Sequence, residues 1–265
     1  MFNDILITGS CVSQGHGLLD LEKNPELWIN QLVDRALNYN PDQIKNISFT
    51  GISNDQVFLE TAHQLINNNF KYVFVTWGPA PSRNLHLGLE TYSTLATICR
   101  APPGKDFNLV GGKVVTNDEV WEISQAWLKY YNYHWDFKEL VYYVNILLDL
   151  AKSRNTKIYF INYSFAWGKN RYFDRLQVSA PNELDEFTQQ VLQCDQRDDV
   201  EIMQLYKKIH DDYENIGGIH EEAWLNLYLP LKHLRVDVVD GGHPGELSQH
   251  QFADYLTEQL QKKLA

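Results

Sequence analysis

Residues 4–15 read DILITGSCVSQG, a short apolar run that passes into a turn with a glycine on either side. The run is rich in β-branched residues and too short for a helix, which indicates a buried strand. Gly9 and Gly15 flank the residues that follow, and a tight strand-to-helix turn of this kind exposes a side chain at the sheet edge. Cys11 lies in this turn, where it can act as a nucleophile. A turn with a purely structural role is the alternative.

The rest of the chain alternates between strand and helix patterns. The other β-branched and aromatic runs are residues 45–50 (KNISFT), 72–77 (YVFVTW), 157–162 (KIYFIN) and 234–239 (LRVDVV). Helical periodicity is found over residues 25–37, 54–69, 118–152, 184–212 and 247–264. This alternation predicts a parallel sheet with right-handed crossovers, covered by helices on both faces. We expect an α/β protein of the flavodoxin-like type, a three-layer α/β/α sandwich with a five-stranded parallel sheet.

The length of 265 residues suits one domain, and we assign residues 1–265 to a single domain. Two connections are longer than a minimal sheet needs, near residues 85–117 and 163–182. The first is expected to contain a hairpin turned at Gly111-Gly112, and the second is aromatic and basic. Connections of this length commonly serve as lids or binding loops.

The charge and cysteine content exclude several classes of protein. The formal net charge is -11 and the chain has no cluster of Lys and Arg, so no nucleic-acid partner is expected. The three cysteines, Cys11, Cys99 and Cys194, are too far apart for a zinc motif or a disulfide framework. His210 and His220 are also too widely spaced to indicate a metal site. We expect neither a metal nor a cofactor.

Neither end of the chain indicates a membrane. The first four residues lead directly into the first strand pattern without the apolar segment of a signal peptide. The apolar runs are too short to cross a bilayer. A cytoplasmic protein without a membrane partner is therefore expected.

A second motif follows the last strand pattern, where residues 240–244 read DGGHP. A carboxylate three residues before an imidazole can orient it, and Asp240 would thus prepare His243 to act as a general base. A solvated loop with a helix-capping Asp is the alternative. Because the carboxyl ends of parallel strands meet at one edge of the sheet, Cys11, His243 and Asp240 can converge there.

With these motifs the chain resembles the SGNH (GDSL-type) hydrolase superfamily over nearly its whole length. Gly9-Ser10-Cys11 with Gly15 falls on the family's Gly-Asp-Ser block, Gly51 on its second-block glycine, and residues 240–244 match its Asp-x-x-His-Pro block. The Gly-Ser-Cys block is also similar to a related group with a Gly-Ser-Cys-Phe-Ala motif and to phage and bacterial surface-polysaccharide proteins.

The resemblance implies an esterase that cleaves or transfers an acyl group through a Cys-His-Asp triad. The substrate would be a small-molecule or carbohydrate ester, such as an O-acetyl group on a sugar. The backbone N–H groups of Cys11 and Gly51 would stabilise the oxyanion, with Asp240 orienting His243.

The chain departs from the family in two blocks. Cys11 replaces the nucleophilic serine, with Ser10 as the alternative nucleophile and Ser13 as a weaker candidate. Ala80 takes the place of the third-block Asn that stabilises the oxyanion, a role that Asn84, Ser82 or Arg83 could supply. Arg83 is also a candidate for substrate binding. The alternative to an enzyme is an inactive protein of the same fold that binds a glycan or another protein.

Overall fold

The computed structural model describes residues 4–15, 27–49, 52–78, 84–87, 90–93, 107–108, 114–115, 133–163, 211, 220–227, 229, 231–239 and 243–265. Within these residues a parallel sheet has the strand order β2-β1-β3-β8. The strands are β1 (Ile5–Gly9), β2 (Ile44–Asn46), β3 (Tyr72–Trp77) and β8 (Lys157–Asn162). The order reverses between β1 and β3, which is the place where doubly wound sheets form their sites.

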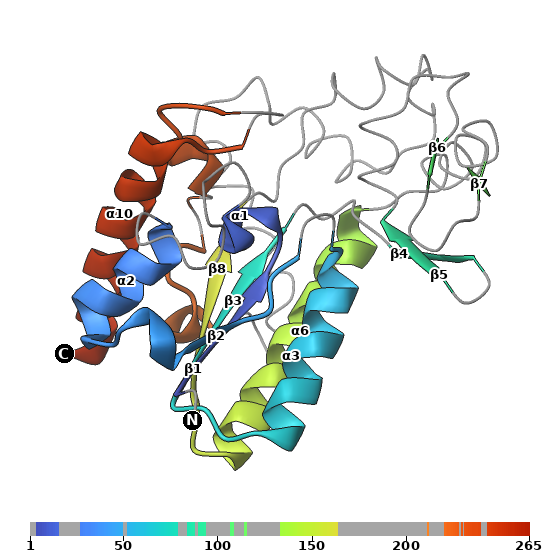
Figure 1. The fold of residues 1–265 in the computed structure, drawn as a ribbon. Coiled ribbons are helices and arrows are strands. Elements are labelled where there is room, and N and C mark those ends of the chain that lie inside the picture. Colours follow the sequence, from blue (N-terminus) through green and yellow to red (C-terminus); the bar gives the residue numbers. More distant parts are fainter. Residues whose placement is uncertain are drawn as a thin grey trace.

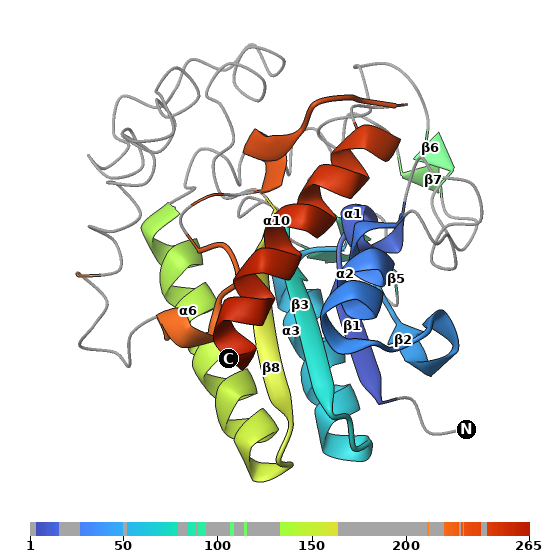
Figure 2. The same ribbon diagram turned by 90° about the vertical axis from the view of Figure 1, so that its left-hand side faces the viewer.

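Helices cover both faces of this sheet (Figures 1 and 2). The first pair, α2 (Trp28–Leu37) and α10 (Glu246–Leu264), packs together on one face. The second pair, α3 (Asn54–Asn67) and α6 (Tyr133–Ser153), packs on the other. Both faces of the central strands are therefore buried, which explains why their sequences are apolar without alternation. The predicted three-layer α/β/α sandwich is confirmed.

Two separate hydrophobic clusters hold the layers together. Alternate residues of β1 point to opposite faces, so Ile5 and Ile7 join the cluster with α2 and α10, whereas Leu6 joins the cluster with α3 and α6. Trp28 and Phe74 are fully buried in the first cluster. Burial of such large side chains supplies most of the free energy that fixes the helices against the sheet.

Several predicted elements match the observed ones closely where the chain is described, but of the predicted strand 45–50 only Lys45 and Asn46 lie in β2. The runs 72–77 and 157–162 are strands over the whole of their predicted lengths. Helices α3 and α10 differ from prediction by one or two residues at their ends. The start of the predicted helix 25–37, the first part of 118–152 and nearly all of 184–212 lie outside the described residues.

The prediction of a fifth strand over residues 234–239 is wrong for the described chain. A 3-10 helix, η6 (Leu231–Leu234), takes the first residue, and only Val238 forms a β-bridge, with Pro244. The carboxylate of Asp237 accepts hydrogen bonds from Leu247 N at 3.1 Å and Ser248 N at 2.7 Å. The segment thus caps α10 instead of joining a strand ladder, although its alternating sequence suits a strand.

The position beside β8 is taken instead by a segment around Trp224. Trp224 forms an isolated parallel bridge with Phe160, and Leu225 N donates to Phe160 O at 2.9 Å. The amide of Asn226 then continues the pairing, because its Oδ1 accepts from Asn162 N at 2.7 Å and its Nδ2 donates to Asn162 O at 2.8 Å. Because the side chain of Asn226 takes the place of a backbone pair in the sheet, the sequence around it shows no strand pattern.

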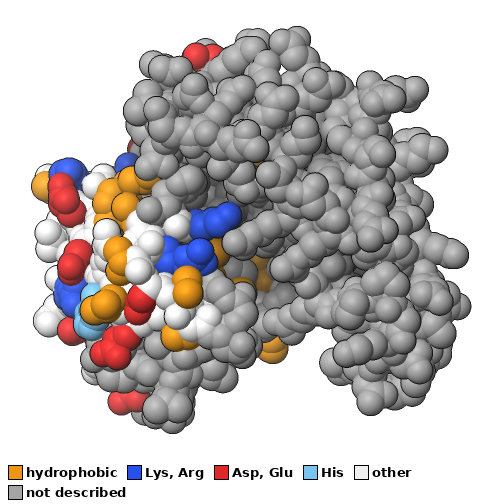
Figure 3. All heavy atoms as spheres, turned by 90° about the horizontal axis from the view of Figure 1, so that it is seen from above, with side chains coloured by type: hydrophobic (Ala, Val, Ile, Leu, Met, Phe, Trp, Pro, Cys, Tyr) orange, Lys and Arg blue, Asp and Glu red, His pale blue; other side chains and the backbone are white. Residues whose placement is uncertain are grey.

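Viewed from above the carboxyl ends of the strands, Lys and Arg side chains gather near the middle of the face, beside hydrophobic ones (Figure 3). The described side chains at the middle of this face thus include cations, although the formal net charge of the chain is -11.

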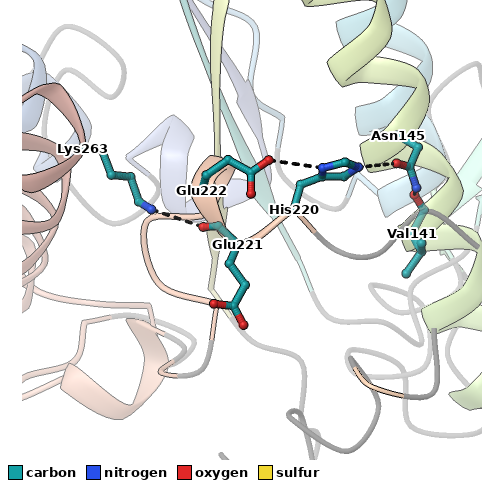
Figure 4. A network of polar contacts seen from close by, with 6 residues as sticks. All are labelled: Val141, Asn145, His220, Glu221, Glu222 and Lys263. Carbon is teal, nitrogen blue, oxygen red and sulfur yellow. Dashed lines mark hydrogen bonds and ion pairs between the residues drawn. The ribbon is translucent and has the colours of Figure 1, made fainter. Parts of the chain in front are cut away.

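Polar contacts attach the turn before Trp224 to two helices (Figure 4). His220 lies at the start of the 3-10 helix η5 (Glu221–Ala223), and its Nε2 is 2.7 Å from Asn145 Oδ1 of α6. Its Nδ1 is 3.2 Å from Glu222 Oε1, and Lys263 of α10 donates to Glu221 O at 3.2 Å. The segment that lengthens the sheet is thereby fixed to a helix on each face.

Two hairpins lie in the predicted insertion at residues 85–117. The pairing of β6 (Phe107–Asn108) with β7 (Val114–Val115) confirms the hairpin expected around Gly111-Gly112. The pairing of β4 (Asn84–Leu87) with β5 (Glu90–Ser93) was not predicted. The signal for it was Gly88-Leu89, because glycine at the first position of a two-residue loop favours a tight hairpin. Of the helices in the described ranges, none has the length and apolarity to cross a lipid bilayer.

Replacing Gly9 with Ala is expected to lower the free energy of unfolding by about 1–3 kcal/mol. A Cβ at Gly9 would lie 2.8 Å from Thr76 Cβ and 2.9 Å from Thr76 O on the neighbouring strand β3. Urea unfolding measures the change. Gly78→Ala is the control, since a Cβ there would meet Ser10 Cβ at an ordinary 3.6 Å. Equal losses in the two variants would contradict the close packing of β1 on β3.

Candidate active site

The turn that carries Cys11 begins directly at the carboxyl end of β1. The short helix α1 (Cys11–Gln14) follows Ser10 and ends at Gly15, whose φ of 87° places it in the left-handed region that favours glycine. Cys11 is half-buried at this edge, whereas Ser10 is 5% exposed and Ser13 is fully buried. The predicted strand-to-helix turn is therefore present, with Cys11 as its most accessible nucleophile.

A chain of three buried hydrogen bonds ties this turn to the loop that carries His243. Trp28 Nε1 donates to Val12 O at 3.2 Å, and Trp28 N donates to Gln249 Oε1 at 3.2 Å. Gln249 Nε2 then donates to Pro244 O at 3.2 Å. Trp28 and Gln249 are both fully buried, so water does not compete for these bonds. Segments more than 200 residues apart are thus brought to the same end of the sheet.

The loop around His243 has a defined shape where it is described. Val239 N donates to His243 O at 2.8 Å, and the β-bridge between Val238 and Pro244 closes the loop. His243 is half-buried. Asp240 lies outside the described residues, so its role as the residue that orients His243 stays a prediction.

Tyr163 and Arg235 extend the site, and neither was predicted. Tyr163 follows β8, and with Cys11 it packs against the hydrophobic cluster of α2 and α10. Burial raises the pKa of Tyr163 to about 12, the charge of nearby Cys11 adds to this rise, and Arg235 opposes it through its charge and a hydrogen bond to the phenol. The phenol therefore stays neutral beside Cys11 at physiological pH. The position of Tyr163 directly after the predicted strand 157–162 was the sequence signal that could have indicated it as a site residue.

Two asparagine side chains, Asn46 and Asn54, bind the backbone around the Cys11 turn. Asn46 Nδ2 donates to Ser13 O at 2.8 Å, which joins the end of β2 to the Cys11 turn. Asn54 Oδ1 accepts from Gly78 N at 2.9 Å, and its Nδ2 donates to Gly78 O at 3.3 Å. The peptide that starts the third-block loop is thus fixed next to Ser10.

The predicted oxyanion and substrate residues are only partly described. Gly51, Ala80, Ser82 and Arg83 lie outside the described residues, and Asn84 begins β4 without a described side chain. Their roles stay predictions. Within the described ranges, no three His, Cys, Asp or Glu side chains are grouped so that they could hold a metal ion.

The fold defines a doubly wound α/β protein, and its candidate site lies beyond the carboxyl ends of β1 and β3. Neither a protein-family model nor a curated protein matches the chain. Among solved structures, it is similar to TesA, with 10% identity, coverage of 98% of both chains and a TM-score of 0.47. It is also similar to a Bacteroides fragilis protein that carries an acylhydrolase assignment, with 10% identity, coverage of 98% of this chain and 88% of that one, and a TM-score of 0.40.

Tyr163→Phe is expected to change how stability depends on alkaline pH. The pKa of Tyr163 rises from 10.0 to about 12 on folding, so the unfolded state loses this proton first as pH increases. The free energy of unfolding of the unmodified protein should therefore fall between about pH 10 and 12, by up to about 3 kcal/mol more than that of Tyr163→Phe.

Urea unfolding at pH 9 and 11 measures about half of this difference, because pH 11 lies midway between the pKa values of the unfolded and folded states. Tyr142→Phe is the control, because Tyr142 is 45% exposed and its variant should follow the unmodified protein. Parallel pH dependence in Tyr163→Phe and the unmodified protein would contradict the buried, neutral phenol.

Proposed function

We propose that this protein is an acyl hydrolase of the SGNH type that uses Cys11 as its nucleophile, His243 as general base and Asp240 to orient His243. The observation that carries the proposal is the chain of three buried hydrogen bonds from Val12 through Trp28 and Gln249 to Pro244. It joins the residue after Cys11 to the residue after His243. A nucleophile and a base at one sheet edge are the arrangement that acyl transfer requires.

The reaction would proceed through a thioester. His243 takes the proton of Cys11, and the sulfur attacks the carbonyl carbon of the ester to form a tetrahedral intermediate. The intermediate collapses as the C–O bond breaks, and His243 returns the proton to the leaving alcohol. A water molecule, deprotonated by His243, then attacks the thioester, which releases the acid and restores the thiol.

The oxyanion would be stabilised by backbone N–H groups of Cys11 and Gly51. Removal of one such donor typically lowers the rate by about 100–1000-fold. Ala80 cannot provide the side-chain donor of the third block, so we assign that role to Asn84, at the start of β4.

The exposure of the side chains supports Cys11 over the serines. Ser10 and Ser13 are 5% and 0% exposed, and neither hydroxyl has a hydrogen-bond partner among the residues that the structure describes. Cys11 is half-buried and therefore more open to a substrate.

An ester of a carbohydrate, such as an O-acetyl group, is the substrate class we propose, with Arg83 as a substrate-binding residue. The Lys and Arg side chains near the middle of the carboxyl edge support a polar or anionic substrate there (Figure 3). Tyr163, near Cys11, supplies a neutral donor, and Arg235, which forms a hydrogen bond with Tyr163, supplies a cation.

Cys11→Ala is expected to remove nearly all hydrolysis of p-nitrophenyl acetate, because the proposed nucleophile is lost. Release of p-nitrophenol at pH 7.5 and mass spectrometry after brief iodoacetamide treatment measure activity and thiol reactivity together. Ser10→Ala is the matched control and should keep the activity within about threefold, since its hydroxyl forms no hydrogen bond in the described structure.

Activity that survives Cys11→Ala and disappears in Ser10→Ala would show that the nucleophile is Ser10. An unmodified protein that is silent toward esters, with a Cys11 that iodoacetamide does not label, would instead favour the non-catalytic binding protein.

A further inference from the structure

We propose that Gln249 is a positioning residue whose buried side-chain amide sets the loop of His243 against the turn of Cys11. The inference rests on the proposed function, because it concerns the same nucleophile and base. Gln249 lies in the first turn of α10 and contacts neither reacting group through the hydrogen bonds of its amide. It would act by holding the backbone on which His243 is carried.

Both polar atoms of the Gln249 amide are committed to backbone groups. Oε1 accepts from Trp28 N, the first residue of α2, where the helix itself provides no partner for an N–H group. Nε2 donates to Pro244 O, the carbonyl one residue beyond His243. Because Gln249 is fully buried, loss of either bond leaves a polar group that water cannot reach and that has no other partner, which is unfavourable.

The loop is thus held on two sides of His243. Val239 N donates to the carbonyl of His243 itself, and Gln249 holds the carbonyl of Pro244. Proline has no N–H group, so its carbonyl is the one backbone group through which this residue can be bound. At the other end of this chain of hydrogen bonds, Trp28 Nε1 donates to the carbonyl oxygen of Val12, the residue after Cys11.

The chemistry requires an amide at position 249. Trp28 N needs an acceptor and Pro244 O needs a donor, and glutamine presents both from one planar group. A glutamate of the same shape keeps the acceptor but, when ionised, faces the Pro244 carbonyl with a second acceptor. The ionised side chain of Gln249→Glu therefore breaks the bond to the His243 loop and keeps the bond to α2.

Gln31 provides a matched control on the same helix interface. It is also buried on α2, and its Oε1 lies 2.9 Å from His250 Nδ1 of α10. It also accepts a hydrogen bond from Arg35, and both of these partners of Oε1 are side chains. Gln31→Leu should lower stability, as Gln249→Glu does, without displacing the His243 loop.

The test compares Gln249→Glu, Gln31→Leu and His243→Ala in the full-length chain. We measure the rate of Cys11 alkylation by iodoacetamide from pH 5 to 9, and kcat and KM for p-nitrophenyl acetate. Gln249→Glu should reduce kcat by about 10–100-fold with KM changed less than about threefold, because small displacements of catalytic groups have effects of this size. Its half-maximal alkylation should move to higher pH, in the direction of His243→Ala. Gln31→Leu should leave kcat and the alkylation profile unchanged.

The outcomes separate the two proposals. If His243→Ala leaves the alkylation profile unchanged, Cys11 and His243 do not act as a pair and both proposals fail. If His243→Ala shifts the profile and Gln249→Glu does not, the proposed function stands and the role of Gln249 is overturned. If Gln249→Glu does not fold, Trp28→Phe takes its place in the test. It loses the hydrogen bond to Val12 O and keeps the backbone bond to Gln249, so its pH of half-maximal Cys11 alkylation should lie between those of the unmodified protein and His243→Ala.

Discussion

The buried hydrogen bonds of Trp28 and Gln249 are the constraint on which the arrangement of the site depends. They link α1, α2, α10 and the loop of His243, and each bond has a backbone group as one partner. In a buried environment a donor or acceptor without a partner is costly, so these segments are stable only in one mutual position. A hydrophobic contact in the same place would tolerate sliding, whereas an amide that must satisfy two groups does not.

The sheet provides the rigid base for this arrangement. Its four described strands are parallel and covered on both faces, and their carboxyl ends lie at one edge. Asn46 and Asn54 bind the turn and the third-block peptide to that edge from the β2 and β3 sides. Polar residues at strand ends therefore perform two tasks here, since some offer chemistry and others hold the backbone that presents it.

Tyr163 and Arg235 illustrate how the site extends beyond its motifs. Neither belongs to a recognisable pattern, yet burial and the proximity of Cys11 keep the Tyr163 phenol neutral, and Arg235 lies beside it. The proposed alkylation of the thiol and the proposed ester chemistry both take place in this partly buried, partly cationic surrounding. Such an environment arises from packing between β8, the segment after η6 and the turn after β1, which lie far apart in the chain.

The sequence by itself determined the layers, the strands 72–77 and 157–162, the turn around Cys11 and the candidate residues at both ends of the chain, because these features are local. Periodicity and turn chemistry act over a few residues. Only the tertiary structure decided that the 234–239 segment caps α10, that Asn226 lengthens the sheet beside β8 and that Gln249 joins the two motifs. Those choices depend on which buried polar group finds which partner, and the partners are separated by up to 221 residues.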